Sequence, residues 1–175
     1  MPRLPTTRLT RLRDELARRG QRRSMVFPSA APSLVEAISI TEEYGALCEV
    51  MFLVMVVERR MLNVQRSLLR GALDMISAGR VRTSHMEAML DSASKRLAEE
   101  GFEKRYQHVV ESLSDDPLRA EMTLVLATAV AAADGVVTAA EQGLIDRFVK
   151  DLGVDPARLV NVLDELTSAP DSSAS

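Results

Sequence analysis

The chain has 175 residues, of which 46% are hydrophobic, 27% charged and only 3% aromatic. This balance is too apolar for a disordered protein and too charged for a membrane bundle, and the length is typical of one domain. The single cysteine, Cys48, excludes a disulfide framework and a zinc site built on several cysteines. A lone cysteine also fits a reducing compartment, so we expect a soluble, cytoplasmic protein.

The first 23 residues form a basic arm. They contain eight arginines against Asp14 and Glu15, a net charge of +6, whereas the whole chain carries −3. Leu9, Leu12 and Leu16 recur at helical spacing between these arginines, which predicts a basic amphipathic helix that ends at Gly20.

Two alternatives follow for this arm. Its leucine face packs on the acidic domain of the same chain, or the arm docks on an acidic partner protein or on an anionic membrane surface. In the second case the candidate partner-binding residues are Arg8, Arg11, Arg18, Arg19, Arg22 and Arg23. The arm has no lysine and no aromatic residue, so we do not expect specific nucleic-acid binding.

The rest of the chain shows helix starts and stops. Capping-box patterns, a Ser or Thr followed three residues later by Glu, occur at Ser33/Glu36, Ser39/Glu42, Ser84/Glu87 and Thr138/Glu141. Two further starts have an aspartate before a proline, and three glycines mark helix ends. The predicted helices are 41–58, 63–77, 84–99, 102–113, 117–133, 139–152 and 156–167.

These elements predict an all-α fold, a helical bundle of about seven to eight helices. We expect a basic N-terminal arm and linker over residues 1–33, a helical domain over 34–167, and a disordered tail over 168–175.

An internal repeat organises the helical domain. A shift of 76 residues aligns Glu58 with Asp134 and Gln65 with Glu141, and it also aligns apolar positions such as Leu68 with Leu144. Both halves then consist of a long apolar helix, an acid near its end, a short turn and an amphipathic helix. The pattern predicts two pseudo-repeated helical hairpins packed face to face.

The turn of the second hairpin places Asp134 and Glu141 at one corner, seven positions apart. This count matches the second half of a calcium-binding EF-hand loop. However, the first two ligand positions of such a loop would be Val130 and Ala132, which have no side-chain oxygen, so an EF-hand is excluded.

The stretch AAADGVVTAAEQGLIDRFVKDLGVDPARL resembles the second repeat of the tellurite-resistance TerB family, and the resemblance extends from about residue 34 to residue 166. The resemblance implies an all-helical repeat domain associated with resistance to tellurite and other stresses. It also implies a divalent cation, Ca²⁺ or Mg²⁺, held by acids at the two corners, here Asp134 and Glu141, with Glu58 at the first. The first corner departs from the family pattern, because it reads Glu58-Arg59 and has Gln65 at the position of the second acid.

Three interpretations of Asp134 and Glu141 remain open. Both acids serve as helix-terminal residues that accept backbone hydrogen bonds, or they hold a weakly bound cation, or Arg59 and Arg60 pair with them across the two hairpins. The sequence has no nucleophile motif, and lone carboxylates such as Glu49 have no evident chemical partner, so we do not expect an enzyme.

The leading functional hypothesis is a non-enzymatic, TerB-like stress-response module that acts through contacts with a protein partner, with a divalent cation at the Asp134/Glu141 corner as an option. The alternative is a metal-free interaction or scaffold domain whose arginine-rich arm docks on an acidic partner or an anionic membrane.

Overall fold

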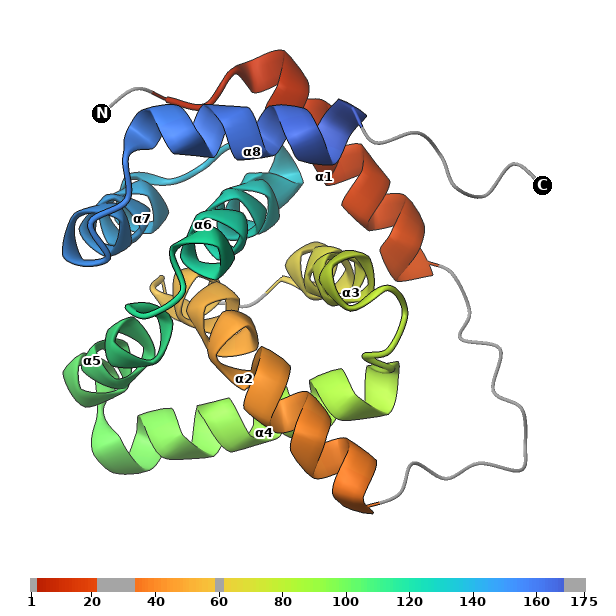
Figure 1. Ribbon diagram of the computed structural model, residues 1–175, viewed down its shortest axis with the longest axis vertical. Helices are drawn as coiled ribbons and strands as arrows, with labels where there is room; N and C mark the ends of the chain where they lie inside the picture. Colours follow the sequence, from red (N-terminus) through yellow and green to blue (C-terminus); the bar gives the residue numbers. More distant parts are fainter. Residues whose placement is uncertain (1–2, 22–33, 59–61, 169–175) are drawn as a thin grey trace.

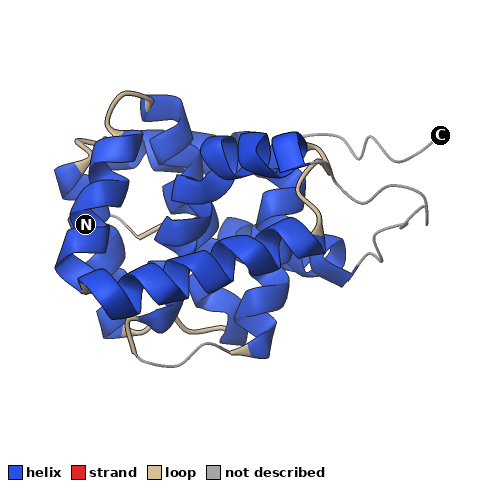
Figure 2. Cartoon of the chain, turned by 90° about the horizontal axis from the view of Figure 1, so that it is seen from below, coloured by secondary structure: helices blue, strands red, loops and turns tan. Residues whose placement is uncertain are grey.

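The computed structural model describes residues 3–21, 34–58 and 62–168. Eight α-helices form one bundle, and the described residues contain no strand (Figures 1 and 2). The all-α prediction is therefore confirmed. The helices are α1 (Thr6–Gln21), α2 (Leu34–Val56), α3 (Asn63–Ser77), α4 (Thr83–Glu100), α5 (Phe102–Leu113), α6 (Pro117–Ala131), α7 (Ala139–Asp151) and α8 (Pro156–Ser168), with a 3₁₀ turn η1 (Ala132–Asp134) after α6.

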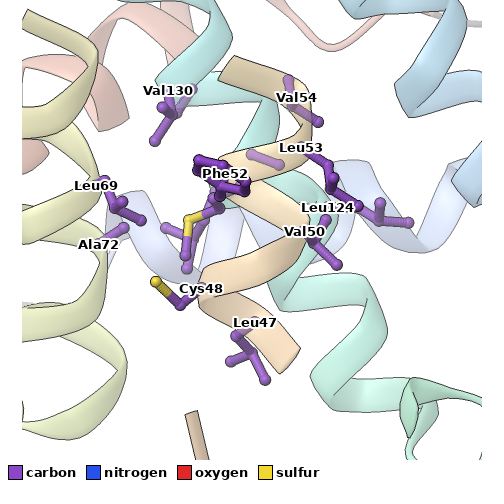
Figure 3. Packing of buried hydrophobic residues seen from close by; sticks show 14 of the residues in the cluster. Leu47, Cys48, Val50, Phe52, Leu53, Val54, Leu69, Ala72, Leu124 and Val130 are labelled. Carbon is purple, nitrogen blue, oxygen red and sulfur yellow. The ribbon is translucent and has the colours of Figure 1, made fainter. Parts of the chain in front are cut away.

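Helices α2 and α6 form the centre of the bundle. Every residue of α2 from Leu47 to Met55 is buried, and so is nearly all of α6. These buried parts are apolar on nearly every side and have to be covered, and the other helices surround the pair (Figure 1). Figure 3 shows side chains of α2 between Leu69 and Ala72 of α3 on one side and Leu124 of α6 on the other.

Most helix boundaries agree with the sequence patterns. Helices α3 and α5 occupy the predicted residues, and α6, α7 and α8 begin where expected. Asp116 Oδ1 accepts a hydrogen bond from the Arg119 amide, and Asp155 Oδ1 accepts one from the Ala157 amide, so both aspartates cap helices as predicted.

Two predicted capping boxes are wrong. Helix α2 begins at Leu34, so Ser39 and Glu42 lie inside it and cap nothing. Helix α4 begins at Thr83, and His85 Nδ1, rather than a glutamate, accepts the hydrogen bond from the Arg82 amide. Glu87 forms an ion pair with Arg66 of α3 instead. The Glu87 carboxylate therefore binds a residue of another helix, and it does not cap the start of its own helix.

The two halves have the same plan. Helices α2, α3 and α4 correspond to α6, α7 and α8, and α3 begins 76 residues before α7. Each central helix also contacts the second helix of the other half, α2 with α7 and α6 with α3. The hairpins thus pack across each other, and α5 connects them (Figure 1).

Helix α1 belongs to this bundle and packs against α3, α6, α8 and η1. The side chains of Leu12 and Leu16 are fully buried. Two glycines allow a very close approach to α3: a Cβ on Gly71 would lie 1.9 Å from the Leu16 carbonyl oxygen, and one on Gly20 would lie 2.0 Å from the Ser67 carbonyl oxygen. The backbones of α1 and α3 touch at these two points, so a methyl group fits at neither.

In the described part of the chain, no helix combines the length and the apolar content that crossing a membrane requires.

We expect Gly71→Ala to lower the free energy of unfolding by about 1–3 kcal/mol, because the added methyl group overpacks the α1–α3 contact. Gly143→Ala is the matched control, since Gly143 lies on α7 and has no atom within 4 Å of an added Cβ. That change should leave stability equal or raise it by up to about 1 kcal/mol through helix propensity. Urea denaturation of both variants measures the difference, and equal effects would contradict the close α1–α3 contact.

Candidate functional site

The second corner lies between the end of α6 and the start of α7. After η1, Gly135 takes a φ of 92°, a conformation that favours glycine. Asp134 Oδ1 accepts a hydrogen bond of 3.2 Å from the Val136 amide, which closes the turn. Thr138 Oγ1 accepts from the Glu141 amide, and Glu141 Oε2 accepts from the Thr138 amide at 3.0 Å. The predicted capping box at Thr138 is thus confirmed.

The Glu141 side chain joins the two halves of the bundle. The residue is only 5% exposed, and its second carboxylate oxygen, Oε1, accepts a 3.0 Å hydrogen bond from Gln65 Nε2. Gln65 Oε1 in turn accepts from the Leu62 amide at 3.1 Å, the same contact that Glu141 makes with Thr138. Gln65 and Glu141, which are equivalent in the repeat, therefore meet in the interior. Each accepts a backbone hydrogen bond at the start of its own helix, and the two side chains bond to each other.

Asp134 and Glu141 do not converge on one point as cation ligands would. Asp134 is exposed and Glu141 is buried with both carboxylate oxygens engaged. Glu58 is exposed just after the end of α2, and Arg59 and Arg60 lie outside the described residues. Across the described ranges, no group of three or more histidine, cysteine, aspartate or glutamate side chains is placed to hold a metal ion.

Helix α1 brings a positive charge to this corner. A Cβ on Gly135 would lie 3.9 Å from Nη1 of Arg13, so the Arg13 guanidinium lies directly over the turn. A cation next to the turn opposes the binding of a second cation there. The sequence did not indicate this contact, because it depends on how α1 docks.

The other predicted arm residues form contacts mainly within the chain. Arg8 pairs with Asp164 of α8, and Arg18 and Arg19 both pair with Glu15. The hydrogen bond from Arg18, with further help from Arg19, holds the pKa of Glu15 below its usual value. Arg11 is exposed on α1, and Arg22 and Arg23 lie outside the described residues.

A buried ion-pair cluster is a feature that the sequence analysis missed. Glu49 of α2, 3% exposed, accepts hydrogen bonds from Arg105 Nε at 2.8 Å and Nη2 at 2.9 Å. Arg96 also bonds to Glu49, and Glu100 bonds to Arg105. The hydrogen bonds that Arg105 donates to Glu49 raise the pKa of Arg105. A glutamate inside an apolar helix was the available signal, but nothing in the sequence indicated its partner, 56 residues away.

Helices α5 and α7 are joined by an aromatic cluster around Tyr106. Its hydroxyl donates a 2.7 Å hydrogen bond to Asp151 Oδ2, and the Arg147 guanidinium stacks 3.8 Å above its ring centroid. Burial, followed by the bond to Asp151, raises the pKa of Tyr106. The Tyr106 hydroxyl and the Asp151 carboxylate are thus engaged with each other.

Cys48 is unsuited to nucleophilic chemistry. Its side chain is buried in α2, and burial raises the pKa of the thiol to about 12. The thiolate form that acts as a nucleophile is therefore scarce at neutral pH.

Comparisons of the chain with protein-family models, with curated proteins and with solved structures gave no match. The TerB-like interpretation therefore depends on the sequence patterns alone.

Replacing Gln65 with leucine should destabilise the fold by about 1–3 kcal/mol, because one buried oxygen of Glu141 loses its donor. The exposed Gln107 of α5 provides a control, and Gln107→Leu should stay within about 0.5 kcal/mol of the parent. Chemical denaturation of both variants measures the two changes. A Gln65→Leu effect as small as that of the control would show that the bond between the halves contributes little.

The ion-pair cluster predicts a non-additive response. Arg105→Met leaves Glu49 without its main partner and should cost about 3–5 kcal/mol, whereas Glu49→Met/Arg105→Met removes both charges and should recover much of that loss. A double-mutant cycle on thermal or urea unfolding tests this. Additive losses in the two single variants would mean that Glu49 and Arg105 act independently.

Proposed function

We propose that the chain is a non-enzymatic, metal-free protein-interaction domain that contacts its partner at the second corner. One observation carries the proposal: both acids of this corner are engaged in hydrogen bonds within the chain, while Val136 at its tip is 65% exposed. The corner therefore offers an apolar contact point rather than a set of cation ligands. Contact through proteins is also what the resemblance to stress-response modules leads us to expect.

The cost of rearrangement supports the metal-free form. A cation at Glu141 would have to reach a side chain that is 5% exposed and would compete with the Gln65 and Thr138 donors for its two oxygens. It would also have to approach the Arg13 guanidinium. One exposed aspartate cannot compensate for these losses, since calcium takes six to eight oxygen ligands.

The burial of α1 gives less support to docking of the arm on a membrane. An amphipathic helix binds a membrane surface through its apolar face. In this chain, that face contains Leu12 and Leu16, which are fully buried within the bundle. A protein partner can still reach the exposed, polar face of α1 while the helix stays in place.

Two experiments test the proposal, one for metal binding and one for the partner contact. Calorimetric titration with Ca²⁺ and with Mg²⁺ should give no saturable binding. The variant Asp134→Ala/Glu141→Ala should only melt earlier, since it loses the turn bond of Asp134 and the two bonds of buried Glu141. Saturable binding that the double variant abolishes would contradict the metal-free form.

The second experiment places a photoreactive amino acid at position 136. The control places it at position 118, because Leu118 is also exposed, with an exposed fraction of 54%. In cells of the source organism, the label at position 136 should form a discrete protein adduct that the label at position 118 does not. Adducts from neither position, or the same adducts from both, would contradict a partner contact at the corner.

A further inference from the structure

A groove lies beside the second corner, between the N-terminal part of α1 and the start of α7. It has a volume of about 610 Å³, which is the size of a typical ligand-binding cleft. Leu4, Leu9 and Val137 provide apolar contacts, and Thr6 and Thr10 add hydroxyl groups. Two elements far apart in the sequence thus enclose a mixed surface.

Two arginines line the groove. Arg3 has no hydrogen-bond or ion-pair partner within the part of the chain that the structure describes. Arg13 uses Nε and Nη2 to contact Asp14, its neighbour on α1, and its Nη1 faces the Gly135 turn. Among the described lining residues there is one acid, Asp146, which accepts a hydrogen bond from Gln142.

The two arginines lie at separate points along the groove. Arg13 is beside Gly135, whereas Arg3 also lines a small adjoining cavity with Ile145 and Leu159, further along α7 and α8. The helical stretch Thr6–Arg13 alone spans about 10 Å at 1.5 Å per residue. A peptide with spaced carboxylates can reach both arginines. The apolar residues between them suit the aliphatic side chains of such a peptide.

We propose that this groove binds an acidic peptide segment of a partner protein, with carboxylates on Arg3 and Arg13 and aliphatic side chains on Leu4, Leu9 and Val137. The inference rests on the proposed interaction function and specifies the chemistry of the partner. Electrostatic complementarity selects the acidic segment, and the apolar contacts add affinity.

The test is an amide-resonance NMR titration of the full chain with a short peptide that alternates glutamate and leucine and is blocked at both ends. The control peptide has glutamine in place of every glutamate. Inorganic phosphate at equal ionic strength is a third titrant. The glutamate peptide should shift the amides of Thr10, Gly135 and Gly143 and saturate. The glutamine peptide and phosphate should not.

Arg13→Glu and Arg3→Glu should each lower the affinity for the glutamate peptide at least about tenfold. Arg11→Glu is the control, because Arg11 is exposed on the same helix, does not line the groove, and changes the net charge equally. Unchanged melting temperatures would show that the variants stay folded. Absence of saturable shifts, equal binding of the glutamine peptide, shifts that phosphate reproduces, or equal weakening by Arg11→Glu would each overturn the proposal.

These outcomes are independent of the cation titration and of photo-crosslinking at position 136. A chain that forms a discrete adduct at the corner and binds no cation, yet does not bind the glutamate peptide, would retain the interaction function and lose only this ligand assignment.

Discussion

The need to cover the second half of α2 and most of α6 determines the arrangement of the bundle. Residues 47–55 of α2 and residues 120–131 of α6 turn almost no side chain toward water, so these parts of the two helices need neighbours around them. The crossed packing of α2 with α7 and of α6 with α3 lets each half cover the other, and α1 closes the side where α3, α6 and α8 meet. The N-terminal helix is thus a part of the core that happens to be basic on its outer face.

The meeting of equivalent residues also gives a reason why one corner has a glutamine where the other has a glutamate. Gln65 and Glu141 occupy equivalent positions and meet in the interior. Two glutamates facing each other there would repel unless a cation or a proton lay between them. A glutamine in place of one acid supplies the missing donor, because its amide gives a hydrogen bond to the carboxylate while its oxygen still closes its own helix start. A hydrogen bond from a neutral amide to the carboxylate therefore joins the two corners at this position.

Local patterns predicted most of the fold, and contacts between distant residues account for what they missed. Helix periodicity, capping residues and glycine stops depend on neighbours within a few positions, so α3, α5 and the capping box at Thr138 were predictable. The 76-residue shift even paired Gln65 with Glu141, although it did not show that they touch. In contrast, the bond between Glu49 and Arg105 and the α1–α3 glycine contact depend on docking angles that no local pattern encodes. The candidate groove was hidden for the same reason.

The arginines of the arm look equivalent in the sequence, but they have different contacts in the folded chain. Arg8 and Arg19 reach acids on α8 and α3, and Arg18 is held by Glu15, so part of the positive charge of the arm is used within the bundle. Arg3 and Arg13 keep donors directed at the groove. Because one wall of the groove is α1 itself, an occupant that touches both walls would also favour the docked position of α1 over any undocked one. Binding at the proposed groove would therefore be thermodynamically coupled to packing of the N-terminal helix, and the leucines that anchor α1 would contribute to the affinity of a site that they do not touch.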